Sequence, residues 1–131
     1  WTNRLTVGSS ISFNQIAYNG SNLYVAVGSS GTLYSSSDGI TWTSRTSGTT
    51  LLLGQNNGGG TGIIYDGSVF LVSGASSLVS ASTDTIAWTL RTSGFGTSSI
   101  QFINFNNSLI IKACSLCLSI VSLTNPVRLE N

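Results

Sequence analysis

The chain has few side chains that could carry out acid–base chemistry. It contains four carboxylates and no histidine, so the commonest general base and metal ligand in proteins is missing. Hydrolysis of a glycosidic bond by the usual route needs two carboxyl groups on either side of the bond. Here three of the acids sit in patterns typical of turns and the fourth is next to the last residue. The acidic residues are Asp38, Asp66, Asp84 and Glu130. We therefore expect no catalytic residue.

Arginine recurs in a regular way, because Arg4, Arg45 and Arg91 each follow the pattern Trp-Thr-x. A cluster of arginines could bind an anion or an acidic sugar. However, residues that occupy the same place in three repeats lie on three separate strands. Two interpretations stay open: each side chain covers a strand edge or pairs with a turn, or it contacts an anion or a glycan.

The two cysteines, Cys114 and Cys117, form a Cys-x-x-Cys pair. A redox pair of this kind would be expected where a helix begins after a strand, whereas this pair lies in a predicted β-hairpin. A zinc site would need two more ligands of the histidine or cysteine type, which the chain lacks. A disulfide across the hairpin and two buried free thiols both stay open. We predict no metal and no cofactor.

The chain repeats one pattern with a period typical of repeat proteins. Trp-Thr-x-Arg begins at Trp1, Trp42 and Trp88, which are 41 and 46 residues apart. Later in each copy, two apolar stretches flank a turn pair of the kind found in tight hairpins. These pairs are Asn19-Gly20, Asp66-Gly67 and Asn106-Asn107.

Each copy thus predicts four short antiparallel strands. In the first copy they cover about residues 12–18, 22–27, 32–36 and 40–46. A unit of this length with four strands is typical of a β-propeller blade. We therefore predict an all-β fold, a single β-propeller segment of three four-stranded antiparallel blades. The repeat units are 1–41, 42–87 and 88–131.

The segment 36–42, Ser-Ser-Asp-Gly-Ile-Thr-Trp, resembles the Asp-box, or BNR, repeat of sialidase-like β-propellers, of the kind found in phage and bacterial surface proteins. In that family the box joins the third and fourth strands of a blade and has a structural role. The segment 82–88 is a second copy without the glycine, and the third position has lost the aspartate and the tryptophan. The structural residues that the resemblance implies are Ser36, Asp38, Gly39, Trp42, Ser82, Asp84 and Trp88.

The physical role of such a box is local. Asp38 can accept hydrogen bonds from backbone N–H groups of its own turn. Gly39 can adopt a backbone conformation that other residues resist. Trp42 can bury a large ring where the outer strand meets its neighbours.

The resemblance places each tryptophan at the start of an outer, fourth strand. The chain then begins with one such strand, in residues 1–6, and its third blade lacks one. Three blades do not close a ring, because propellers usually have 4–8 blades. Either copies associate head to tail, or the chain is part of a longer propeller, which the missing initiator Met favours. The strand that would complete a neighbour's third blade contains Trp1, Thr2, Asn3, Arg4 and Leu5.

Composition narrows the choice of partners. Charged residues make up 7% of the chain and the net charge is +1, so no basic patch supports nucleic-acid binding. No apolar run is long enough for a membrane-spanning helix. A weakly charged surface rich in Ser, Thr and Asn is common outside cells and in virion parts. We therefore expect an extracellular or virion-surface location.

We predict a non-enzymatic structural or adhesive propeller module of a virion (capsid decoration, tail or fibre) or an extracellular filament. Its partners would be copies of itself or other structural proteins. The alternative is a lectin-like propeller that binds glycans, for which Tyr24, Tyr34 and Trp42 could serve. A fragment of a sialidase-like glycosidase is a more distant alternative, because the required carboxylates are missing.

Overall fold

The computed structural model describes residues 2–51, 53–54, 62–76, 78–92, 100–105, 109–113 and 120–123. These residues form eleven strands and one short 3-10 turn, η1 (Ser29–Gly31), and they contain no α-helix. The strands are β1 (Phe13–Tyr18), β2 (Tyr24–Gly28), β3 (Leu33–Ser36), β4 (Thr43–Ser44), β5 (Ile63–Tyr65), β6 (Phe70–Ser73), β7 (Leu78–Ser82), β8 (Thr89–Thr92), β9 (Ile100–Phe105), β10 (Leu109–Ala113) and β11 (Ile120–Leu123).

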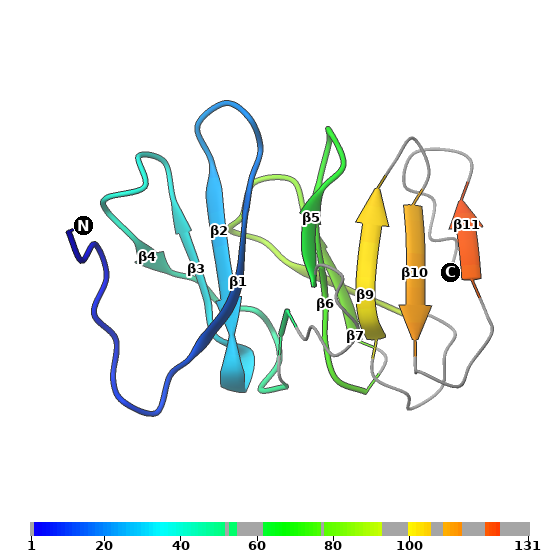
Figure 1. Ribbon diagram of the computed structural model, residues 1–131, viewed down its shortest axis with the longest axis horizontal. Coiled ribbons are helices and arrows are strands. Elements are labelled where there is room, and N and C mark those ends of the chain that lie inside the picture. The colour runs from blue at the N-terminus through cyan, green and yellow to red at the C-terminus, as the bar shows by residue number, and fades with distance from the viewer. Residues whose placement is uncertain are drawn as a thin grey trace.

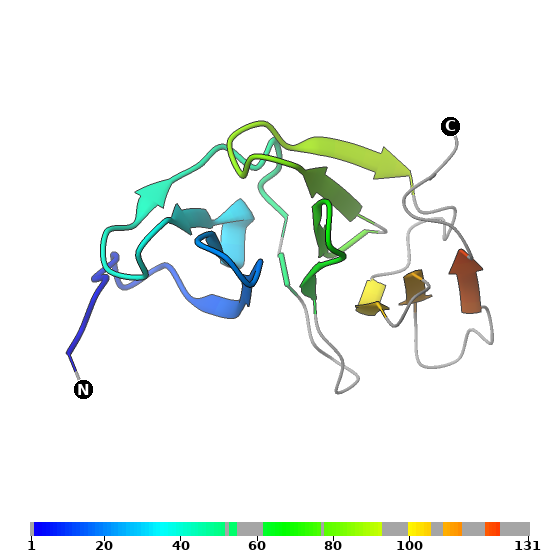
Figure 2. The same ribbon diagram turned by 90° about the horizontal axis from the view of Figure 1, so that it is seen from above.

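The strands form three antiparallel sheets in which strands adjacent in sequence are paired. Their orders are β1-β2-β3-β4, β5-β6-β7-β8 and β9-β10-β11, and we call these sheets the first, second and third blade. The blades stand side by side along an arc, with the first and the third at opposite ends (Figures 1 and 2). The first strands of neighbouring blades lie next to one another, β1 by β5 and β5 by β9. The prediction of an all-β fold built from four-stranded antiparallel units is confirmed for the first two blades.

Side chains that bind the backbone fix the hairpins between the first two strands of the first and second blades. Asn19 accepts hydrogen bonds at its Oδ1 from three following N–H groups, at 2.9 to 3.0 Å. Asp66 accepts two such bonds in the second blade, both at 2.8 Å. Gly20 and Gly67 follow these residues with φ of 83° and 99°, a region that favours glycine. Both predicted hairpins are therefore confirmed, and the third lies outside the described residues.

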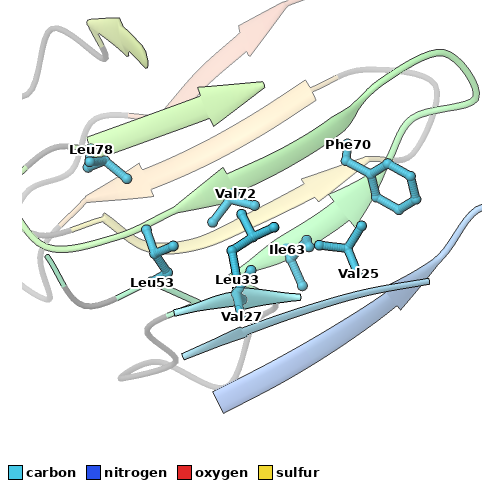
Figure 3. Close-up of a cluster of buried hydrophobic side chains, with 8 residues drawn as sticks. All are labelled: Val25, Val27, Leu33, Leu53, Ile63, Phe70, Val72 and Leu78. Carbon is cyan, nitrogen blue, oxygen red and sulfur yellow. The ribbon is translucent and has the colours of Figure 1, made fainter. Parts of the chain in front are cut away.

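The first core lies between the first and second blades (Figure 3). Alternate residues of β2 and β3 point toward the second blade, and alternate residues of β6 and β7 point back at them, because successive side chains of a strand point to opposite faces. The buried residues of this core are Val25, Val27, Leu33, Leu53, Ile63, Phe70, Val72 and Leu78. This packing joins the two blades into one body.

A second core lies on the other side of the second blade. It contains Leu71, Val79 and Ala81 of the second blade and Ile100 and Ile103 of β9. Successive residues of β6 therefore face different cores, and all four of them are buried. A strand that is covered on both faces reads as a continuous apolar run, which is why "FLV" shows no alternation.

Two strand boundaries differ from the predicted ones, for local reasons. The fourth strand of the first blade was expected over 40–46 and is limited to β4, because the preceding residues are used by a turn. The second strand was expected from residue 22 and begins at Tyr24, because Asn19 binds the N–H groups of Asn22 and Leu23.

The N-terminal segment Thr2–Thr6 belongs to no strand of this chain, and four of its five residues are exposed. Figure 2 shows that this end of the chain leads away from the first blade. Its pairing with a neighbouring copy stays a prediction. Trp1, Cys114, Cys117 and Glu130 lie outside the described residues.

Within the described ranges, no helix has the length and apolar character needed to cross a membrane.

Replacing Phe70 with alanine tests whether the first core holds the blades together. The side chain is fully buried, so Phe70→Ala should lower the free energy of unfolding by about 3–5 kcal/mol, measured by urea denaturation. Leu90→Ala is the control, because Leu90 is 50% exposed and its loss should change stability by about 0.5 kcal/mol or less. Similar losses in both variants would contradict the assignment of the core.

Candidate functional site

Two of the acidic residues singled out by the sequence, Asp38 and Asp84, lie in equivalent turns. Residues 36–42, the first aspartate turn, connect β3 to β4, and residues 82–88, the second aspartate turn, connect β7 to β8. Each turn therefore joins the third and fourth strands of its blade, and Trp42 and Trp88 directly precede the fourth strands, as expected.

The first aspartate turn is closed by one carboxylate oxygen and one hydroxyl group. Oδ1 of Asp38 accepts hydrogen bonds from the N–H groups of Ile40 at 2.8 Å and Thr41 at 2.7 Å. The same oxygen accepts the hydroxyl of Ser36 at 3.0 Å, and the Ser36 Oγ accepts the N–H of Gly39 at 2.9 Å. The Ser36 Oγ also accepts the N–H of Asp38 at 3.3 Å, so four N–H groups of the turn are satisfied without any other part of the chain.

The second aspartate turn repeats this pattern although it lacks the glycine. Asp84 accepts the N–H groups of Ile86 and Ala87 at 2.8 and 2.9 Å and the hydroxyl of Ser82 at 3.1 Å. Thr85 stands where the first turn has Gly39 and has a φ of 64°, close to the 70° of the glycine. This backbone region is unfavourable for a β-branched residue, so the surrounding hydrogen bonds and the burial of Thr85 must hold it there.

The turns keep both carboxylates charged. The N–H groups of Thr41 and Ile40 lower the pKa of Asp38 from 3.8 to about 2. The N–H groups of Ala87 and Ile86 lower the pKa of Asp84 in the same way. A carboxylate that is ionised and already bound to its own backbone is a poor general acid.

The third described carboxylate, Asp66, caps its hairpin in the same manner. The three acids therefore lie in three different turns, each bound to N–H groups of that turn. Among the residues that the structure describes, no three His, Cys, Asp or Glu side chains gather into a possible metal site.

The three repeated arginines occupy different surroundings. Arg45 follows β4 and donates from Nε to the Oγ of Ser35 at 2.8 Å, inside its own blade. Arg91 lies on β8 and Arg4 on the N-terminal segment, and both are exposed. The contact of Arg45 favours the structural interpretation for this residue.

A shallow groove of about 620 Å³ lies beside the segment that follows β4. It is lined by Gly31, Arg45, Thr46, Ser47, Gly48, Thr49 and Thr50. Arg45 is the one charged residue among these, and its Nε is already bonded to Ser35. The groove contains no acid or base that could act on a substrate.

The structure also gathers aromatic residues on one side of the first blade. We call the side of a blade that is turned toward the N-terminal end of the arc its leading face. Strand registers place Phe13, Ile16, Tyr18, Tyr24 and Tyr34 on the leading face of the first blade, opposite to Val25 and Val27. Ring centroids are 4.3 Å apart for Tyr18 and Tyr24, 5.5 Å for Phe13 and Tyr34, and 6.4 Å for Tyr24 and Trp42.

The sequence analysis named Tyr24, Tyr34 and Trp42 as candidate ligand contacts but missed the residues of β1. The alternation of apolar residues in "FNQIAY" could have revealed Ile16 and Tyr18 as one face of a strand. The hydroxyl of Tyr18 donates to the Ser21 carbonyl at 2.6 Å. Partial burial beside Tyr24 raises the pKa of Tyr18, which keeps this hydroxyl protonated.

The blades are antiparallel meanders that stand next to one another, and their first strands are neighbours along the arc. This arrangement is typical of a β-propeller. The chain belongs to the DUF6242 beta propeller domain family. The model of that family matches residues 1–115. The predicted β-propeller is therefore confirmed.

A solved structure described as YCF48 bound to D1 peptide is similar to this propeller, with a TM-score of 0.63 and 16% sequence identity. The similarity covers 84% of this chain and 37% of that chain, so the propeller segment spans little more than a third of the other protein's length. At this identity the similarity concerns the fold alone. No curated protein matches the chain.

Asp38→Asn should reduce the acid sensitivity of the propeller. The pKa of Asp38 is lowered in the folded state, so its stabilising effect is complete above about pH 3.8 and is lost as the pH falls through about 2. The wild-type melting temperature should therefore drop between pH 4 and pH 2, and the drop should be smaller in Asp38→Asn. Ser37→Ala, in the same turn, is the control with wild-type behaviour. An unchanged pH profile in Asp38→Asn would contradict this role.

Ser36→Ala should destabilise the first blade by about 1–3 kcal/mol, because it removes a buried hydroxyl and leaves the N–H of Gly39 without its acceptor. Urea denaturation of this variant and of Ser37→Ala measures the difference. Ser37 is exposed, so its loss should change the unfolding free energy by about 0.5 kcal/mol or less. Equal stability of the two variants would show that the hydroxyl does not hold the turn.

Proposed function

We propose that the chain is a non-enzymatic structural or adhesive propeller module of a virion or an extracellular filament. One observation carries this proposal: each described carboxylate accepts hydrogen bonds from the N–H groups of its own turn. The acids of this part of the chain therefore stabilise the fold and are not arranged to act on a substrate.

In this proposal the two aspartate turns are Asp-box repeats of the sialidase-like kind. Both contain the same serine–aspartate contact, at 3.0 and 3.1 Å, and both connect the third strand of a blade to the fourth. The second turn supports the assignment although Thr85 replaces glycine, since its backbone has the same conformation.

The proposed location is extracellular or on the surface of a virion. The support comes from composition, because 7% of the residues are charged and the net charge is +1. Uncharged hydroxyl and amide side chains cover the surface in place of the charged ones that are usual in globular proteins.

The partner in this proposal is a further copy of the chain, arranged head to tail. Propellers usually contain 4–8 blades. The described part of one copy contains three sheets, so two copies would supply six. The described N-terminal segment, Thr2–Thr6, pairs with none of the described strands, and in this proposal it pairs with a strand of the other copy.

Glycan binding is the second candidate function. It is favoured by the aromatic residues of the leading face, where Tyr18 is 44% exposed and stacks on Tyr24. Tyrosine and tryptophan combine an apolar ring with a polar group and suit partly wet binding surfaces. The solved structure of YCF48 holds a D1 peptide, so a protein that shares this fold can work by binding.

Three measurements on the full chain test the proposal. We expect no hydrolysis of fluorogenic glycosides, sialosides included, no signal on a broad glycan array, and a mass in solution above the 13.6 kDa of one chain. Hydrolysis in proportion to protein concentration would contradict the non-enzymatic role. Selective binding to one glycan class would favour the second candidate, and a monomer at every concentration would contradict head-to-tail association.

A further inference from the structure

The leading face of the first blade is an apolar sheet surface that neither of the other two blades covers in the described part of the chain. Ile16 is 59% exposed, Tyr18 44% and Phe13 37%. Tyr24, Tyr34 and Trp42 are half-buried, and Tyr34 contacts Phe13 while Tyr24 contacts Tyr18 and Trp42. None of these six side chains is charged, although charges are the usual protection of an exposed sheet against association.

The equivalent face of the second blade is covered. In the repeat, Ile63, Tyr65 and Phe70 stand where the first blade has Ile16, Tyr18 and Tyr24. Ile63 is 3% exposed and Phe70 is fully buried. The cover is the opposite face of the first blade, which contributes Val25, Val27 and Leu33 to the shared core (Figure 3).

The two tryptophans show the same difference. Trp88 packs against the core between the first and second blades, and its Nε1 donates to the Thr85 carbonyl at 3.1 Å. Trp42 has the equivalent position in the first blade, and its described aromatic neighbour is Tyr24. The leading face of the first blade is therefore built like a blade-to-blade interface of which one side is present.

The residue types also suit a contact between separate chains. Tyr24 stands where the covered face has Phe70, and Tyr34 stands where it has Ser80. Tyrosine and tryptophan are enriched at interfaces between protein molecules, because their polar atoms tolerate water before association.

The third blade has three described strands, with β11 at its edge. The N-terminal segment begins with the same Trp-Thr-x-Arg pattern that leads into β4 and β8, but its described residues are in no strand.

The connection between the first two blades shows how an outer strand of one blade and the leading face of the next are placed together. The outer strand β4 of the first blade leads to the inner strand β5 of the second, and the leading face of the second blade packs against the first. By the same connection, a copy whose N-terminal segment pairs beside β11 of a neighbour would place its own leading face against that neighbour's third blade.

We infer that the leading face of the first blade, formed by Phe13, Ile16, Tyr18, Tyr24, Tyr34 and Trp42, is the docking surface for the third blade of a second copy of this chain. The inference rests on the head-to-tail association proposed above, and it assigns that association to one surface. The contact repeats the interface between the first and second blades, with the N-terminal segment as the added outer strand.

A matched pair of variants tests the surface. Ile16 and Ile86 are both 59% exposed, but Ile86 lies in the second aspartate turn, away from the leading face. Sedimentation velocity of the wild type should give twice the 13.6 kDa mass of one chain. Ile16→Glu should raise the dissociation constant about 100-fold or more, because it buries an unpaired charge in the contact. Ile86→Glu should associate like the wild type.

Two further variants guard against a folding defect. Ile16→Thr keeps a β-branched residue in β1 and should weaken association by about 10-fold, the effect of removing apolar area from an interface. Leu5→Pro removes a backbone donor from the N-terminal segment and should also weaken association. Circular dichroism and melting temperature should match those of Ile86→Glu in each case.

The possible failures are distinguishable. A wild type that stays monomeric would overturn both the head-to-tail association and the docking surface. If the folded Ile16→Glu variant associates as strongly as the wild type, the docking surface is overturned and the head-to-tail association still stands. A glycan that binds the monomeric wild type and is lost in Ile16→Glu would assign the face to sugars and overturn its role as a contact between copies.

Discussion

The packing of one blade face against the next is the interaction on which the rest of the molecule depends. Val25 and Val27 from one side and Phe70 and Val72 from the other exclude water between the first two blades. The apolar side chains on both faces of β6 are buried, because one face packs in each of the two cores. This stacking holds the sheets side by side, while local hydrogen bonds close the hairpins and turns within each of the first two blades.

The few charges serve the same architecture. Asp38, Asp66 and Asp84 neutralise the partial charges of N–H groups in turns where no strand partner is available. Arg45 donates a hydrogen bond to the buried Ser35 of its own blade. The described carboxylates therefore bind backbone N–H groups that have no partner in a strand. None of them lies between blades where it could act on a substrate.

Much of the fold could be predicted from periodicity. The spacing of Trp42 and Trp88 and the hairpin pairs that follow Tyr18 and Tyr65 define a four-stranded unit, because strands, hairpins and the aspartate turns are set by nearby residues. Long-range facts were harder to predict. The exposure of Ile16 depends on whether a blade packs beside it. The left-handed backbone of Thr85, at a position where the first turn has glycine, depends on the burial and hydrogen bonding of Thr85 in the fold.

The serial arrangement of the sheets has a consequence for how the molecule loses its structure. Each sheet packs against its sequence neighbours, so stability is close to a sum of terms between adjacent units, as in other repeat architectures. Within one chain, the second blade contributes to both cores, and the first and third blades contribute to one core each. Unfolding that starts at the first or third blade removes one of the two cores and leaves the other two blades packed together. Disruption of β6 or β7 removes both cores at once, because each of these strands contributes to both.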